Sequence, residues 1–219
     1  MTSAAERRER ILARIARATA VAGRKPGDVQ LIAVSKGRSA EEIQALIDAG
    51  QRDFGENRVQ EALSKWPQLL ARRPDLRLHG IGRLQSNKGA EAVRLFDTIH
   101  SLDRPSLLDA LNAEAKKAGR TPSVYIQVNI GQEEQKGGCA LSELGELVEA
   151  VRASRLPLAG LMAIPPLAVE AAPYFALLGK LARRHDVSGL STGMSSDFEA
   201  AIMLGATAVR VGTAMFEDQ

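Results

Sequence analysis

The chain has 219 residues, 45% of them hydrophobic and 25% charged, a composition that excludes a disordered or fibrous protein and predicts one globular domain over residues 1–219. Its 29 basic residues are interspersed with 26 acidic ones, so the net charge of +3 forms no basic stripe and we expect no nucleic-acid partner. We find neither an apolar run of roughly 20 residues nor a signal sequence, and the single cysteine, Cys139, excludes an internal disulfide; we therefore expect a cytoplasmic protein with no membrane partner.

Residues 4–22 predict an amphipathic helix. Apolar residues such as Ile11 and Ile15 recur at helical spacing among arginines, and a glycine ends the pattern. A basic amphipathic helix can also lie on a membrane surface or serve as a transit peptide. Because Glu6 and Glu9 interrupt the basic face, we favour a helix that covers one end of the domain.

The rest of the chain alternates between short β-branched or apolar runs and helical segments. The predicted strands begin near Leu31, Arg52, Arg77, Asp97, Ser123, Pro157, Val187 and Ala206. The predicted helices between them cover residues 40–49, 57–66, 104–118, 141–152, 172–184 and 196–204. This alternation in a chain of domain size predicts an α/β fold, a single closed (β/α)8 barrel of the TIM type with an extra N-terminal helix. An open doubly wound sheet is the alternative.

Polar residues cluster where the predicted strands end. In a TIM barrel these ends form the functional face, so the residues there are candidates for a site. They are Lys36, the run 56–58, Arg83, Asn129, the run 191–195 and the run 210–213. One mouth of the barrel is therefore expected to gather a lysine, two arginines, two asparagines and two turns rich in glycine and hydroxyl groups.

Lys36 closes the apolar run 31–34 at the end of the first predicted strand. At the barrel mouth its amine would be partly desolvated, which lowers the pKa of a lysine and makes the amine nucleophilic. A surface lysine just beyond a strand end is the alternative, and position alone does not decide between the two. The polar residues expected around Lys36 favour the reactive amine.

Two glycine turns follow the last two predicted strands. Gly193 leads through Met194 and Ser195 into a helix, and Gly212 and Thr213 follow the final strand. Backbone N–H groups at such turns bind phosphate, and phosphate sites of TIM barrels are frequently built after strands seven and eight. A capped helix and a tight turn would explain either segment alone. Both together favour a phosphate site.

Arg210 is expected to point into the barrel mouth, where it would pair with a carboxylate or hydrogen-bond an aromatic ring nitrogen. A structural ion pair with Glu56 is the alternative. His79 could stack on a ligand or donate a proton, although a lone histidine on a strand is more often a core residue. His100 and His185 have no metal-ligand spacing, so we predict no metal site.

Several segments resemble the pyridoxal phosphate homeostasis protein family. They are AVSK at 33–36, FGENRVQEA at 54–62, HGIGRLQSNK at 79–88, VNIGQEEQKGG at 128–138, GLMAIPP at 160–166 and the late stretch STGMSSDFEAAIMLGATAVRVGTAMF at 191–216. The likeness runs across nearly the whole chain, so we take it as a family resemblance.

The resemblance implies a barrel like the N-terminal domain of alanine racemase, with pyridoxal 5′-phosphate as a cofactor in Schiff-base linkage to Lys36. By the same match Ser195 and the Gly212 turn would hold the phosphate, Arg210 would face the pyridine nitrogen and Asn57 would lie beside the ring. The residues expected at the cofactor are Lys36, Asn57, His79, Met194, Ser195, Arg210, Gly212 and Thr213.

The resemblance further implies a carrier that serves intracellular vitamin B6 homeostasis and has no catalytic residues. A racemase needs an acid/base group opposite the lysine and normally a protonated pyridine, which an arginine at the ring nitrogen would prevent. Alanine racemases take that group from a tyrosine of a further domain, and neither Tyr125 nor Tyr174 belongs to a catalytic motif that we recognise. We expect a monomer that passes the cofactor to apo-forms of pyridoxal-phosphate-dependent enzymes. A small pyridoxal-phosphate-dependent amino-acid racemase or related enzyme is the alternative.

Overall fold

The computed structural model describes residues 2–167 and 169–218. In this part of the chain eight parallel strands form a closed barrel in chain order, and the last strand pairs with the first. The strands are β1 (Gln30–Val34), β2 (Asp53–Glu56), β3 (Arg77–Gly80), β4 (Thr98–Leu102), β5 (Ser123–Gln127), β6 (Leu158–Met162), β7 (Leu190–Ser191) and β8 (Ala208–Val211). The predicted TIM-type barrel is confirmed, and the open doubly wound sheet is ruled out.

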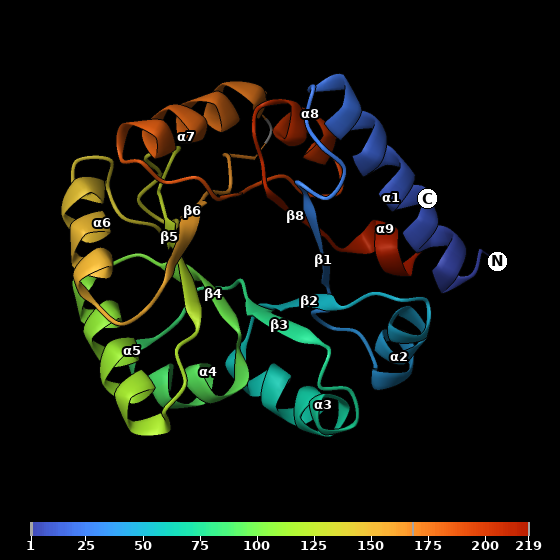
Figure 1. Cartoon of the computed structure of the whole chain (residues 1–219), viewed down its shortest axis with the longest axis horizontal. Coiled ribbons are helices and arrows are strands. Elements are labelled where there is room, and N and C mark those ends of the chain that lie inside the picture. The colour runs from blue at the N-terminus through green and yellow to red at the C-terminus, as the bar shows by residue number, and fades with distance from the viewer. Residues whose placement is uncertain (1, 168, 219) are drawn as a thin grey trace.

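A ring of helices surrounds the barrel (Figure 1). Among the described residues they are α1 (Ala4–Val21), α2 (Ala40–Asp48), α3 (Val59–Arg72), the 3-10 turn η1 (Ser86–Lys88), α4 (Gly89–Leu95), α5 (Pro105–Ala118), α6 (Leu144–Ala153), α7 (Ala172–Arg184), α8 (Phe198–Met203) and α9 (Thr213–Phe216). The sequence did not predict α4 and α9, because segments of seven and four residues are too short to display a helical period. Helix α3 continues through Pro67 because Trp66 and Leu69, on either side of it, are buried and hold the helix in place.

Helix α1 begins with a capping box, in which the Glu6 N–H donates to Ser3 Oγ at 3.2 Å and the Ser3 N–H donates to the Glu6 carboxylate at 2.7 Å. The helix packs against α8 and α9 (Figure 1), and its buried residues include Ile11 and Ile15. The predicted N-terminal helix is confirmed, and it covers the flank of the domain beside α8 and α9. Because α8 and α9 have only six and four residues, α1 completes the ring of helices there. No helix in the described residues combines the length and the apolar character that crossing a bilayer requires.

The strands are buried on both faces, as a parallel barrel inside a ring of helices requires. All four residues of β2 and of β8 are buried. The interior is not wholly apolar, however. Five buried polar residues from five different strands hydrogen-bond to one another across it: Asp53, His79, His100, Ser191 and Arg210. This polar chain leads from β2 towards the barrel mouth, where Arg210 lies.

Candidate functional site

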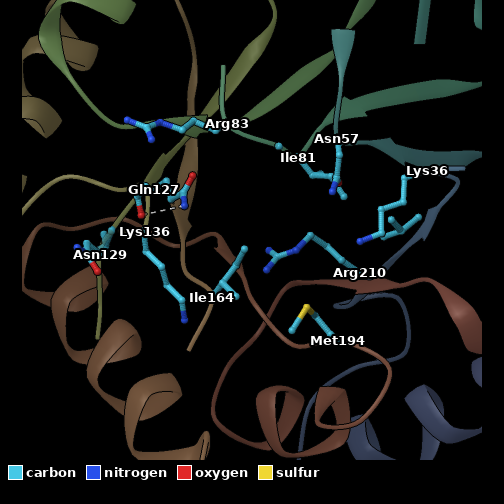
Figure 2. A pocket seen from close by; sticks show the side chains of 14 residues that line it. Lys36, Asn57, Ile81, Arg83, Gln127, Asn129, Lys136, Ile164, Met194 and Arg210 are labelled. Carbon is cyan, nitrogen blue, oxygen red and sulfur yellow. Dashed lines mark hydrogen bonds between the residues drawn. The ribbon is translucent and has the colours of Figure 1, made fainter. Parts of the chain in front are cut away.

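A cleft opens at the mouth of the barrel, where the carboxyl ends of the strands meet. It has two adjoining parts, a larger lobe of about 370 Å³ and a smaller lobe of about 260 Å³. Val34, Lys36, Met194 and Arg210 line both lobes, which makes them one continuous cleft. Figure 2 shows the side chains of Lys36 and Arg210 between those of Asn57 and Met194.

Lys36 lies at the junction of the two lobes. Gly37 follows it with a left-handed φ of +69°, a conformation that favours glycine, and turns the chain away from the mouth. The Lys36 side chain is exposed, and its amine makes no hydrogen bond or ion pair with any residue that the structure describes. The partial desolvation expected for this amine stays a prediction. The structure presents a free amine that points into the cleft (Figure 2).

The two turns after β7 and β8 line the smaller lobe. Ser195 and Ser196 come from the first turn, Gly212 and Thr213 come from the second, and the Gly212 N–H donates to Ser195 Oγ at 3.3 Å. The backbone N–H groups of Ser195, Ser196 and Thr213 have no acceptor among the residues described. Arg38 lines the same lobe, and its guanidinium is paired with the carboxylates of Glu42 and Glu217. Backbone N–H groups without an acceptor at such turns can form a cradle for an anion such as a phosphate.

Arg210 is 4% exposed and is held by neutral acceptors. Its Nη1 donates to the Ser191 carbonyl at 2.8 Å and to Ser191 Oγ at 2.6 Å, and its Nη2 donates to the Ala163 carbonyl at 3.1 Å. Burial lowers the pKa of Arg210 to about 10, so it stays charged at neutral pH. The alternative ion pair with Glu56 is absent from the described contacts, because Lys65 pairs with that carboxylate instead.

Of the eight residues expected at the cofactor, seven line the cleft: Lys36, Asn57, Met194, Ser195, Arg210, Gly212 and Thr213. His79 does not. It is 2% exposed in the barrel interior, where its Nε2 lies 3.2 Å from Asp53 Oδ1 and its Nδ1 lies 3.0 Å from His100 Nε2. A polar partner on each side holds His79 away from the cleft, so its direct contact with a ligand finds no support in the geometry.

Sequence reasoning missed most of the larger lobe. Its further lining includes Ile81, Gln127, Lys136 and Ile164. Lys136 comes from the loop between β5 and α6, and its ammonium lies 2.6 Å from the Glu133 carboxylate. Lys136 lies in the segment 128–138, of which the sequence predicts only Asn129 at the barrel mouth, and Asn129 also lines this lobe. Such loop residues carry no periodic signal, and only their position after a strand end indicates a site.

The family model of the alanine racemase N-terminal domain matches residues 7–219 of the chain. A curated relative from Pseudomonas aeruginosa, named pyridoxal phosphate homeostasis protein, is 44% identical over 225 residues, which cover 99% of this chain and 96% of the relative. The solved structure of PipY from Synechococcus elongatus with pyridoxal phosphate bound is 39% identical with a TM-score of 0.79, over 93% of this chain and 99% of that one.

Alanine racemases share the fold at much lower identity. The enzyme from Corynebacterium glutamicum is 19% identical with a TM-score of 0.66, and the match covers 93% of this chain and 60% of the racemase. That likeness concerns the barrel alone. From the family model and from relatives matched over almost their whole length, the chain belongs to the alanine racemase N-terminal domain family and, within it, to the pyridoxal phosphate homeostasis proteins.

Proposed function

We propose that this protein binds pyridoxal 5′-phosphate in the cleft and carries it, linked to Lys36, as part of intracellular vitamin B6 homeostasis. The observation that supports this most is that one cleft holds the free Lys36 amine, backbone N–H groups without an acceptor and the Arg210 guanidinium. When bound, the cofactor supplies an aldehyde carbon that condenses with a primary amine, with loss of water.

The residues of the cleft fit the parts of that cofactor. The smaller lobe, with Ser195 and Thr213, offers N–H groups to a phosphate. Arg210 uses three of its five N–H groups on described protein acceptors, so two are left for a ring nitrogen. Asn57 and Met194 line the cleft beside Lys36 and Arg210 and would contact the ring (Figure 2).

The proposal assigns no catalytic residue. Tyr125 stacks on His100 inside the barrel with ring centroids 4.4 Å apart, and Tyr174 lies on α7, so neither tyrosine lines a lobe of the cleft. Arg210, which stays charged, would donate to the ring nitrogen and keep it unprotonated, and this weakens the electron withdrawal on which racemases rely. Both features support a carrier.

We further propose that residues 1–219 act as one domain, a cytoplasmic monomer that releases the cofactor to apo-forms of pyridoxal-phosphate-dependent enzymes. Both lobes are lined by residues of one chain, so a monomer suffices to hold the ligand. Transfer is measured as recovered activity of an apo-enzyme mixed with the loaded protein. No recovery beyond that given by the cofactor released into solution would contradict the handover.

The direct test is the absorbance spectrum of the protein after addition of pyridoxal phosphate. We expect a visible band that borohydride abolishes, and peptide mass mapping should then find the reduced adduct on Lys36. The variant Lys36→Ala should lose this adduct. A colourless protein after addition of the cofactor, or an adduct on another lysine of the unaltered protein, would contradict the proposal.

The phosphate cradle is tested by comparing pyridoxal with pyridoxal phosphate. We expect Ser195→Ala to weaken binding of the phosphorylated form by about tenfold or more, because a hydrogen bond to a charged group is worth about 1.5–3 kcal/mol. Ser142→Ala, which removes an exposed hydroxyl outside both lobes, is the control. Equal affinity of the unaltered protein for the two forms would show that no phosphate site exists.

Exchange of the α-hydrogen of amino acids in deuterated water separates the carrier from an enzyme. A carrier should exchange little faster than free cofactor, whereas enzymes turn over at about 1–10³ s⁻¹. Rapid exchange with one amino acid, without transfer to any apo-enzyme, would favour the amino-acid racemase or a related enzyme.

A further inference from the structure

An unbroken chain of hydrogen bonds crosses the barrel interior from Arg210 to Asp53. Arg210 Nη1 lies 2.6 Å from Ser191 Oγ, and Ser191 Oγ lies 2.8 Å from His100 Nδ1. His100 Nε2 lies 3.0 Å from His79 Nδ1, and His79 Nε2 lies 3.2 Å from Asp53 Oδ1. Between Arg210 and Asp53, the residues Ser191, His100 and His79 are only 0–2% exposed, so water does not compete for their hydrogen bonds.

The two end residues, Arg210 and Asp53, determine where the proton lies on each side chain between them. Burial alone would raise the pKa of Asp53, but hydrogen bonds from Arg77 and His79 outweigh it and lower the pKa to about 2, so Asp53 only accepts. His79 therefore donates through Nε2, and in the direction that runs from Arg210 to Asp53 its Nδ1 accepts from His100 Nε2–H. His100 in turn accepts at Nδ1 from the Ser191 hydroxyl, which accepts from Arg210.

The reverse direction would leave a hydrogen without an acceptor. If His79 were doubly protonated, it would donate to His100, and His100 would donate through Nδ1 to Ser191 Oγ. That oxygen also accepts from Arg210, and the Ser191 hydroxyl hydrogen would then have no acceptor among the described residues. A buried donor without an acceptor is unfavourable, because it has lost its hydrogen bond to water and gained none in the protein. The chain that runs from Arg210 to Asp53 satisfies every hydrogen.

We propose that Ser191, His100 and His79 are positioning residues that hold the Arg210 guanidinium in one orientation, with its two unused N–H groups directed at the ring nitrogen of the bound cofactor. This inference rests on the proposed function. The far end is itself anchored, because Asp53 accepts two further hydrogen bonds from Arg77, each of 2.6 Å. The orientation of Arg210 therefore depends on residues that never touch the ligand.

The neutral ring of His100 supports hydrogen bonds that all run in one direction, from Arg210 to Asp53. Burial is the largest cause that lowers the pKa of His100 well below its ordinary value, and it keeps the ring neutral. Tyr125 stacks on the same ring at an interplanar angle of 13°, which fixes its plane. A neutral histidine ring with one fixed tautomer accepts on one side and donates on the other, so the hydrogen bonds keep one direction. A charged ring donates on both sides.

Nitrogen-15 NMR of the histidine rings tests the direction in the unaltered protein without cofactor. Near neutral pH we expect both buried rings to be neutral and to carry their proton on Nε2, and the part-buried His185 provides the comparison. Ser191→Ala should shift the His100 Nδ1 signal, because that nitrogen loses its donor. A charged ring, or a proton on Nδ1 of either buried ring, would overturn the proposal.

Cofactor release tests the consequence for the site. We expect Ser191→Ala to release pyridoxal phosphate about tenfold faster than the unaltered protein and to shift the visible band of the loaded protein. Ser101→Ala is the matched control, because it also deletes a buried hydroxyl and Ser101 Oγ has no hydrogen-bond partner among the described residues. Unchanged release and an unchanged band in Ser191→Ala would overturn the proposal.

The two experiments separate failure of this inference from failure of the proposed function. If the unaltered protein does not take up pyridoxal phosphate, the proposed function fails, and the positioning role fails with it. If it takes up the cofactor on Lys36, and Ser191→Ala behaves like Ser101→Ala, only the positioning role fails.

Discussion

Acidification is expected to destabilise the fold through His100. Its pKa is lowered well below the ordinary 6.5 by burial, so the unfolded chain takes up a proton there that the folded chain refuses. Stability that depends on this neutral ring is complete above the unfolded pKa and falls as the pH drops below it. For one such group the free energy of unfolding falls by about 1.4 kcal/mol between about pH 7.5 and pH 5.5.

Urea unfolding at several pH values measures this loss. His100→Asn offers an acceptor near the position of Nδ1 but no group that titrates in this range, so its free energy of unfolding should fall by about 1.4 kcal/mol less than that of the unaltered protein. His185→Gln is the control, because His185 is only part-buried, and it should keep the larger fall. Equal falls in His100→Asn and the unaltered protein would show that burial does not hold the ring neutral.

Two further changes test the packing. Gly160→Ala should prevent a stable barrel, because the new Cβ would lie 2.2 Å from the Gly189 carbonyl oxygen, whereas Gly89→Ala, whose nearest neighbour is 3.7 Å away, should unfold at close to the unaltered temperature. Similar thermal unfolding of both variants would contradict this. Burial raises the pKa of Cys139 to about 12, so alkylation followed by mass spectrometry at mildly alkaline pH should be slow in the folded protein and fast in urea. Rapid labelling of the folded protein would refute that.

The sequence was sufficient for the barrel and for the part of the site that lies directly at strand ends. Lys36, Arg210 and the two glycine turns each follow or close an apolar strand, so the known geometry of a parallel barrel brings them together. The loop that carries Lys136 has no such pattern, and its contribution to the larger lobe emerges only from the folded chain.

The polar chain inside the barrel could not be predicted from single residues. His79 and His100 each look like isolated core histidines, since their partners lie on other strands, and the register of the closed barrel decides which side chains meet. The neighbours of α1 could not be predicted for a related reason. Its apolar stripe predicts that it packs on something, and only the shortness of α8 and α9 determines where.

The cleft draws on both ends of the chain. Lys36 follows the first strand, whereas Ser195, Arg210 and Gly212 belong to the segments around the last two. During translation Lys36 is synthesised early and the residues of the anion cradle late. The growing chain therefore contains the lysine long before it can bind a phosphate beside it. Loading of a ligand in this cleft therefore follows translation and closure of the barrel, and the ligand stabilises the finished fold without guiding its early steps.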